Sequence, residues 1–166
     1  MATHIATDAG CSVVLPIEGE RIPIFDDEVV VKVNGVQTAG AYTLVTLSLA
    51  PGGGPPLHAH RGSETCYVLS GEFEFTVRDA RGVSTFRVGP GAVVHAPSGA
   101  AHRFENVSPT RSTLLQVLSP ELVDFLRQVG AAFPSGAHSD TEKMQAISAK
   151  HGTVMIYDAE GSRPEP

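Results

Sequence analysis

Short apolar segments, separated by turns rich in glycine and proline, constrain the fold of this chain more than any other feature. Residues 72–77 illustrate the pattern, because they read EFEFTV and alternate between polar and apolar, as expected of a strand with one buried face. Similar segments recur from residue 28 to residue 118, with turns such as Ser70-Gly71 between them. Many short strands at near-regular spacing predict an all-β sandwich or barrel.

The expected strands share β-branched or alternating apolar residues and end at turn signals. They cover residues 28–33, 42–50, 57–61, 64–69, 73–78, 85–88, 91–96, 102–106 and 112–118. The PGGGPP run at residues 51–56 can form neither a helix nor a paired strand, because its prolines lack the amide hydrogen and its glycines lack side chains. It therefore predicts an irregular loop before the short strand that follows.

After residue 118 the apolar spacing changes to that of a helix. Ser119 is expected to cap this helix, with Pro120 in its first turn and Gly130 at its end. Its apolar stripe consists of Leu122, Phe125, Leu126 and Val129. A second helix is expected to start at Ser139 or Asp140 and to stop at Gly152. The chain thus divides into an N-terminal arm or edge strand (1–21), a β-barrel (22–118), C-terminal helices (119–152) and a tail (153–166).

Composition excludes several classes of partner and location. The chain has 166 residues, the size of one domain, and its 12 Lys and Arg against 18 Asp and Glu give a net charge of −6. A nucleic-acid partner is therefore not expected, and no apolar run approaches the roughly 18 residues of a membrane span. Two cysteines, Cys11 and Cys66, cannot form a disulfide framework, and the first ten residues do not resemble a secretory signal. A cytoplasmic location is the prediction.

A cluster of metal-binding residue types stands out in the predicted β-rich body. His58 and His60 are two apart on a strand, so their imidazoles point to the same face. Glu64 follows after a tight link, and His102 lies on a later strand. Three imidazoles and one carboxylate suit Fe, Mn, Ni, Co or Zn, and four ligands leave open coordination positions, as in catalytic sites. We expect one divalent transition metal per chain.

The spacing around these residues resembles the two sequence motifs of the cupin superfamily. The first motif corresponds to Gly52, His58, His60, Glu64 and Gly71, and the second to Gly91, Pro97, Gly99, His102 and Asn106. This resemblance implies a single-domain jelly-roll β-barrel with His58, His60, Glu64 and His102 as metal ligands. We expect Asn106 to hydrogen-bond the backbone of a turn rather than to bind the metal.

Residues 40–128 resemble more closely the small single-domain quercetin (flavonol) dioxygenases and their relatives. That resemblance implies an oxidoreductase, in which O2 cleaves an aromatic or enolic small molecule and Glu64 accepts the substrate's hydroxyl proton. Two alternatives share every ligand: a metal-dependent cyclase or isomerase of secondary metabolism, and a non-catalytic metal- or small-molecule-binding cupin. A homodimer is expected, in which the arm before residue 22 adds a strand to the partner's sheet.

An apolar pocket suits a flat substrate, and strand parity provides candidate walls. The candidate substrate contacts are Cys66, Phe73, Phe75, Phe104 and Phe125. Each of them fits a core position at least as well. Relatives often carry an aromatic residue at the position of Cys66, and an apolar one at that of His95. We expect Cys66 to act as a small buried hydrophobic residue and His95 to lie outside the pocket.

Overall fold

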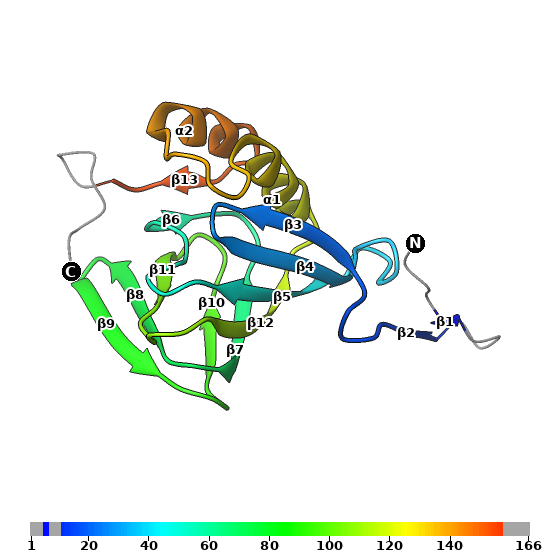
Figure 1. Ribbon diagram of the computed structural model, residues 1–166. Helices are drawn as coiled ribbons and strands as arrows, with labels where there is room; N and C mark the ends of the chain where they lie inside the picture. The colour runs from blue at the N-terminus through cyan, green and yellow to red at the C-terminus, as the bar shows by residue number, and fades with distance from the viewer. Residues whose placement is uncertain (1–4, 7–10, 158–166) are drawn as a thin grey trace.

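The computed structural model describes residues 5–6 and 11–157 of the chain. Two antiparallel sheets form its body (Figure 1). The six-stranded sheet runs in the order β10 (Val93–Ala96), β7 (Glu64–Ser70), β12 (Ser112–Leu118), β5 (Thr43–Leu49), β4 (Asp27–Val33) and β3 (Glu20–Ile24). The five-stranded sheet runs in the order β13 (Val154–Met155), β6 (His58–Ala59), β11 (Ala101–Asn106), β8 (Phe73–Asp79) and β9 (Gly82–Val88).

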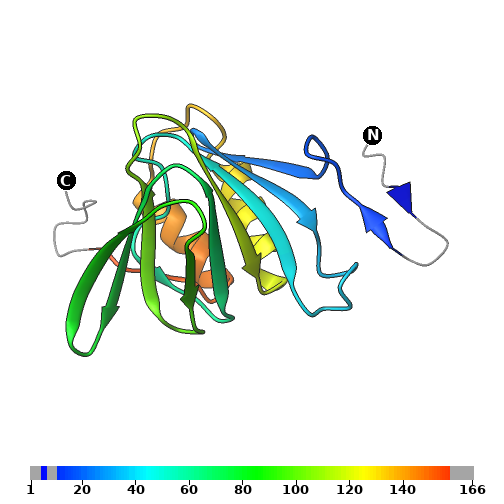
Figure 2. The same cartoon turned by 90° about the horizontal axis from the view of Figure 1, so that it is seen from below.

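The two sheets face each other and enclose the main core (Figure 2). Alternate residues of each strand point inward, so the burial pattern of β5 is strictly alternating. The side chains that fill the space between the sheets include Val45, Leu47, Val68, Phe73, Phe75, Phe104 and Leu114. This confirms the predicted β-rich class and the inward faces expected for the central strands.

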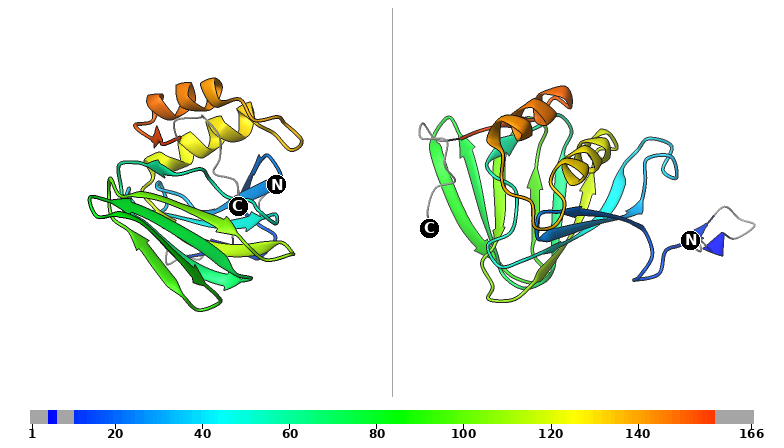
Figure 3. Two further views of the ribbon diagram at one scale, coloured as in Figure 1. Left: turned by 90° about the vertical axis from the view of Figure 1, so that its left-hand side faces the viewer. Right: turned by 45° about the horizontal axis from the view of Figure 1, so that its top comes forward.

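The predicted closed barrel is not what the structure shows. Within the part of the chain that the structure describes, no strand pairing joins one sheet to the other, so the sheets form an open sandwich. The open edges are β3 and β10 in one sheet and β13 and β9 in the other. Helices take the place of strand pairing on one side, because α1 (Glu121–Ala132) packs on β3 and α2 (Thr141–Lys150) packs on β13 (Figure 3).

Both expected C-terminal helices are present, and their ends differ in part from the prediction. Asp140 caps α2 by accepting a hydrogen bond from the Lys143 amide at 3.0 Å, as predicted. Ser119 does not cap α1, because Pro120 occupies the N-cap position without a side-chain bond. Gly130 does not end α1 either, since the helix continues to Ala132. A Cβ at Gly130 would come within 2.6 Å of Ile22, so this glycine allows α1 to approach β3 closely.

A second apolar cluster lies between the helices and the sheet edges. It contains Phe125 and Val129 of α1, Phe133 after it, and Ile147 of α2. Phe133 also stacks on Phe25, with ring centroids 5.0 Å apart. The apolar stripe predicted for α1 is therefore buried, and it joins the two helices to the edge of the six-stranded sheet.

The N-terminal arm contains two short strands, β1 (Ile5–Ala6) and β2 (Ser12–Val13), which pair with each other away from the sheets (Figure 1). Residues 1–4 and 7–10 of the predicted arm lie outside the described residues. Strand addition to a partner stays a prediction. The helices of the described residues are too short or too polar to span a membrane.

Candidate metal centre

Three buried histidines meet between the two sheets. His58 lies on β6 directly opposite His102 on β11, and their ring centroids are 4.5 Å apart. His60 follows two residues after His58 on the same face, as the strand spacing predicted. One nitrogen of each ring lies within 4.8 Å of the others, so the three side chains can together hold a metal ion.

Each histidine is oriented by a hydrogen bond from its Nδ1 to a backbone carbonyl. The acceptors are the carbonyl oxygens of Pro56 at 2.9 Å, Arg61 at 3.2 Å and Ala100 at 2.9 Å. Because a carbonyl oxygen only accepts, each Nδ1 carries the hydrogen and each Nε2 carries a lone pair. The Nε2 atoms of His60 and His102 are buried without a hydrogen-bond partner among the described residues. This arrangement is typical of imidazoles prepared for a metal.

Glu64 places a carboxylate beside two of these rings. It is the first residue of β7, and only 5% of its surface is exposed. Its Oε2 lies 3.5 Å from Nε2 of His60, and its Oε1 lies 3.5 Å from Nε2 of His102. Burial favours the neutral acid, but the adjacent His102 and His60 rings outweigh it and hold the pKa of Glu64 below its usual value. The carboxyl group is therefore ionised.

The donor set requires positive charge at its centre. Burial, reinforced by neighbouring His102, lowers the pKa of His58 to about 4, so this ring is neutral near pH 7. Burial opposes the protonated form of His102, but the Glu64 carboxylate beside it outweighs burial and raises the pKa of His102, so positive charge is favoured between these two side chains. Imidazoles together with a carboxylate suit borderline divalent metals such as Fe, Mn, Ni, Co and Zn. The residues present therefore fit the predicted metal.

Two turns hold His60 in place. The backbone carbonyl of His60 accepts a hydrogen bond from the Gly99 amide at 2.9 Å, and the Gly62 amide donates to the Ser98 hydroxyl at 3.2 Å. Gly62 has a φ of +83°, and a Cβ there would collide with Ser119. Gly62 and the motif glycine Gly99 thus bring the link after His60 against the turn before β11.

Asn106 has the structural role that the sequence predicted. Its side chain is fully buried, and its Nδ2 donates to the carbonyl oxygens of Leu49, Ala50 and Thr110 at 2.8–3.1 Å. Its Oδ1 accepts from the Ser108 amide at 3.0 Å. Asn106 therefore ties the end of β11 to two loops, and it does not point at the histidines.

Gln116 is a site residue that the sequence analysis missed. It lies on β12, opposite Cys66 of β7, and it is buried. Its Nε2 donates to Oε1 of Glu64 at 3.1 Å and contacts the Cys66 sulfur at 3.1 Å. Strand parity could have found it, because Leu114 and Leu118 point inward on the same strand.

The histidines and Glu64 line little open space. The cavity next to them has a volume of about 20 Å³, which is close to one water molecule. It is lined by Glu64, Cys66, Phe75, Val77, Val94, His95, Ala96 and His102. Two of the five predicted substrate contacts, Cys66 and Phe75, border this cavity.

The other three predicted contacts lie elsewhere. Phe73 and Phe104 are buried in the main core, and Phe125 is buried in the second cluster between the helices. None of them is among the residues that line the small cavity. His95 is exposed and hydrogen-bonds the Thr65 hydroxyl at 2.9 Å. It is nevertheless among the residues that line the small cavity, so the expectation that it lies outside the pocket is not confirmed.

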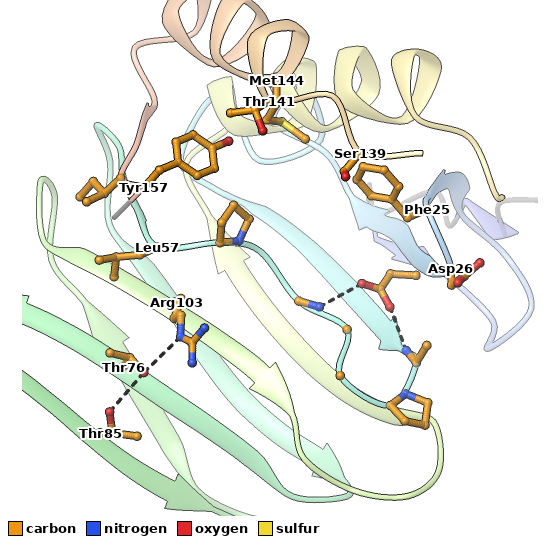
Figure 4. A pocket seen from close by; sticks show the side chains of 18 of the residues that line it. Phe25, Asp26, Leu57, Thr76, Thr85, Arg103, Ser139, Thr141, Met144 and Tyr157 are labelled. Atoms are coloured by element: carbon orange, nitrogen blue, oxygen red, sulfur yellow. Dashed lines mark hydrogen bonds between the residues drawn. The ribbon is translucent and has the colours of Figure 1, made fainter. Parts of the chain in front are cut away.

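A much larger groove, of about 840 Å³, lies on the outer face of the five-stranded sheet (Figure 4). Arg103 and Thr76 form part of its floor, and Met144 of α2 and Tyr157 lie across from them. The Arg103 Nε donates to the Thr76 hydroxyl at 3.3 Å. His102 precedes Arg103 on β11 and points to the opposite face, so the groove and the metal centre share no lining residue.

Comparisons with known proteins agree with this geometry. Residues 45–118 match the family model of the cupin domain. An uncharacterized protein of Streptomyces coelicolor is 36% identical over 62 residues, which are 37% of this chain and 55% of that protein. The chain thus spans about half the length of this curated relative.

Solved structures with the same fold share less sequence. A predicted oxalate decarboxylase from Thermotoga maritima has a TM-score of 0.53 at 24% identity, over 60% of this chain and 90% of its own. The polyketide cyclase RemF from Streptomyces resistomycificus has a TM-score of 0.57 at 22% identity, over 66% of this chain and 80% of RemF. An RmlC-like cupin from Shewanella frigidimarina has a TM-score of 0.55 at 23% identity, over 67% of this chain and 92% of that cupin.

These findings show a likeness to cupins over part of the chain. Residues 45–118 are similar to the cupin domain, and the fold is that of the solved structures named above, as the motif spacing predicted. At such low identity the structural likeness establishes the fold alone. The closer resemblance to quercetin dioxygenases is not confirmed.

Proposed function

We propose that this protein is a metal-dependent enzyme that binds one divalent transition metal and acts on an enolic or aromatic hydroxyl group, with O2 as co-substrate. The observation that carries the proposal is the arrangement of three buried Nε2 atoms beside the ionised Glu64. His58, His60 and His102 would hold the metal, and Glu64 would complete the set. A bound divalent metal supplies Lewis acidity, which makes a substrate hydroxyl easier to deprotonate.

Glu64 is the proton acceptor in this proposal. Its carboxylate is ionised and buried, so a hydroxyl that enters the cavity would find an anionic oxygen within hydrogen-bond reach. The proton would move to Oε2, the oxygen that faces His60. The three histidines keep their orientation during this step, because their Nδ1–H groups stay hydrogen-bonded to backbone carbonyl oxygens.

The volume of the cavity bears on the size of the substrate. About 20 Å³ admits a single hydroxyl group, and it is far smaller than the ring system of a flavonol. The apolar wall of Val94, Ala96 and Phe75 favours an uncharged, flat group beside that hydroxyl. A substrate would therefore place only its hydroxyl-bearing end in this cavity, which favours a small enolic molecule over quercetin.

A cyclase or isomerase is the second candidate. Proton removal by Glu64 beside a metal would serve either reaction without O2, and the polyketide cyclase RemF shares the fold. A third possibility, a binding protein without turnover, would use the same histidines. Oxygen consumption separates the first candidate from the others.

The test measures O2 uptake and product formation with protein reconstituted with Fe, Mn, Ni, Co or Zn in turn. The substrates are quercetin and a small β-diketone. Glu64→Gln should lose about 10²-fold or more in turnover, the usual scale for a missing general base. Glu142→Gln, an exposed carboxylate on α2, is the matched control and should retain full turnover.

Three outcomes would contradict the proposal in different ways. Product without O2 uptake would favour the cyclase or isomerase. Bound ligand without product would favour a binding protein. Wild-type turnover in fully metallated Glu64→Gln would remove Glu64 as the base.

A further inference from the structure

Gln116 is a buried amide that lies between two buried leucines on β12. Its neighbours on the inward face of β12, Leu114 and Leu118, are both buried in the main core. An amide in such surroundings is costly unless its hydrogens are bonded. Only 3% of Gln116 is exposed, so its partners must come from the protein interior.

Both partners of this amide belong to the metal centre. Nε2 lies 3.1 Å from Oε1 of Glu64 and 3.1 Å from the Cys66 sulfur. The amide nitrogen, not the amide oxygen, must face Glu64, because a carboxylate can only accept. The Cys66 thiol also donates to Oε1 of Glu64, at 3.4 Å.

Glu64, Cys66 and Gln116 therefore all contact one another, and they come from two neighbouring strands. Glu64 and Cys66 are two apart on β7 and share its inner face, and Gln116 sits opposite Cys66 in the register with β12. Two donors converge on Oε1, while Oε2 faces His60 at 3.5 Å. The carboxylate plane is thereby fixed against rotation about its terminal bond.

We propose that Gln116, assisted by Cys66, is the positioning residue that fixes the carboxylate of Glu64 for metal binding. This inference rests on one part of the proposed function, namely that Glu64 binds the metal together with the histidines. Glu64 is the candidate metal ligand to which Gln116 donates a hydrogen bond. Partners of this kind typically change metal affinity 10–100-fold when they are removed.

The test replaces the amide without changing its size. Gln116→Met keeps the length of the side chain and removes the donor, and Gln145→Met makes the same change on the exposed side of α2. The probe is Co²⁺ alone, whose dissociation constant is measured by competition with a coloured chelator. We expect binding about 10–100-fold weaker in Gln116→Met and unchanged in Gln145→Met.

A second measurement separates positioning from a structural role. The visible absorption of the Co²⁺-loaded protein reports the ligand geometry, and we expect it to change in Gln116→Met and not in Gln145→Met. If Gln116 only supported the fold, Gln116→Met would melt at a lower temperature while its Co²⁺ affinity and spectrum stayed those of the wild type. That result overturns the proposal.

Cys66→Ala provides the test should Gln116→Met not fold. It removes the weaker of the two donors to Oε1, so we expect a loss of Co²⁺ affinity at the lower end of the 10–100-fold range and an altered spectrum. Wild-type affinity and spectrum in Cys66→Ala would then overturn the proposal. If the proposed function alone is wrong, the wild-type protein will bind Co²⁺ tightly but will turn over no substrate, so this failure can be told apart. A wild-type protein that binds no Co²⁺ would refute both.

Discussion

Asn106→Ala should be among the most destabilising single substitutions in this protein. The side chain is completely buried, and its amide group bonds three carbonyl oxygens while its own oxygen bonds the Ser108 amide. The alanine variant removes all of these bonds, although the Ala50 and Thr110 carbonyls each keep a second donor, the Gly53 amide and the Ser112 hydroxyl respectively. The Leu49 carbonyl is the one in fully buried surroundings, so it bears the largest penalty.

The size of the effect follows from the number of bonds. The two hydrogens of Nδ2 are shared among three acceptors, so they amount to about two hydrogen bonds, and Oδ1 adds about one more. At about 1 kcal/mol for each bond, and a further 1–3 kcal/mol for the Leu49 carbonyl, the free energy of unfolding should fall by about 4–6 kcal/mol. That is a large share of the roughly 5–15 kcal/mol that stabilises a typical domain.

Urea denaturation monitored by circular dichroism measures this loss directly. Asn34→Ala is the control, because the Asn34 side chain bonds the Val36 and Gln37 amides in an exposed turn. Water can replace those bonds, so the control should lose only about 1 kcal/mol. The reasoning would be refuted if Asn106→Ala lost no more than Asn34→Ala.

Three further substitutions test the metal centre and the second apolar cluster. His58→Ala and His102→Ala should each weaken metal binding by more than about 100-fold, since even outer partners of a metal change affinity 10–100-fold. The exposed His138→Ala should retain its metal, and full occupancy in either site variant after purification without chelator would remove that residue from the centre. Phe125→Ala should lower the free energy of unfolding by about 3–5 kcal/mol and leave substrate affinity unchanged, because the ring is packed between the helices. Weaker substrate binding at unchanged stability would instead place Phe125 at the substrate.

Residue spacing predicted the centre of the molecule well. The strand over residues 112–118 has the predicted bounds, and the convergence of His58, His60 and His102 follows from two short motifs. These features depend on local rules, namely the two-residue repeat of a strand and the backbone freedom of glycine in tight turns. Such rules can be applied to a single sequence.

The features that the sequence did not predict depend on contacts between distant segments. The strand β13 has only two residues, and it exists because they pair with β6. Gly130 looked like a helix end, whereas the close approach of β3 requires it inside α1. Whether the two sheets close into a barrel likewise depends on what packs at their edges, and here α1 and α2 do so. No local pattern contains that information.

The distance along the chain between the metal-binding side chains has a kinetic consequence. His60 and His102 are separated by about forty residues, and the strands β7 and β12 that carry Glu64 and Gln116 are far apart as well. Such long-range pairings form slowly, so the centre is assembled late in folding. An ion that binds only the assembled centre hardly accelerates folding, but it retards unfolding. The metal would thus lengthen the lifetime of each folded molecule while leaving the time needed to fold almost unchanged.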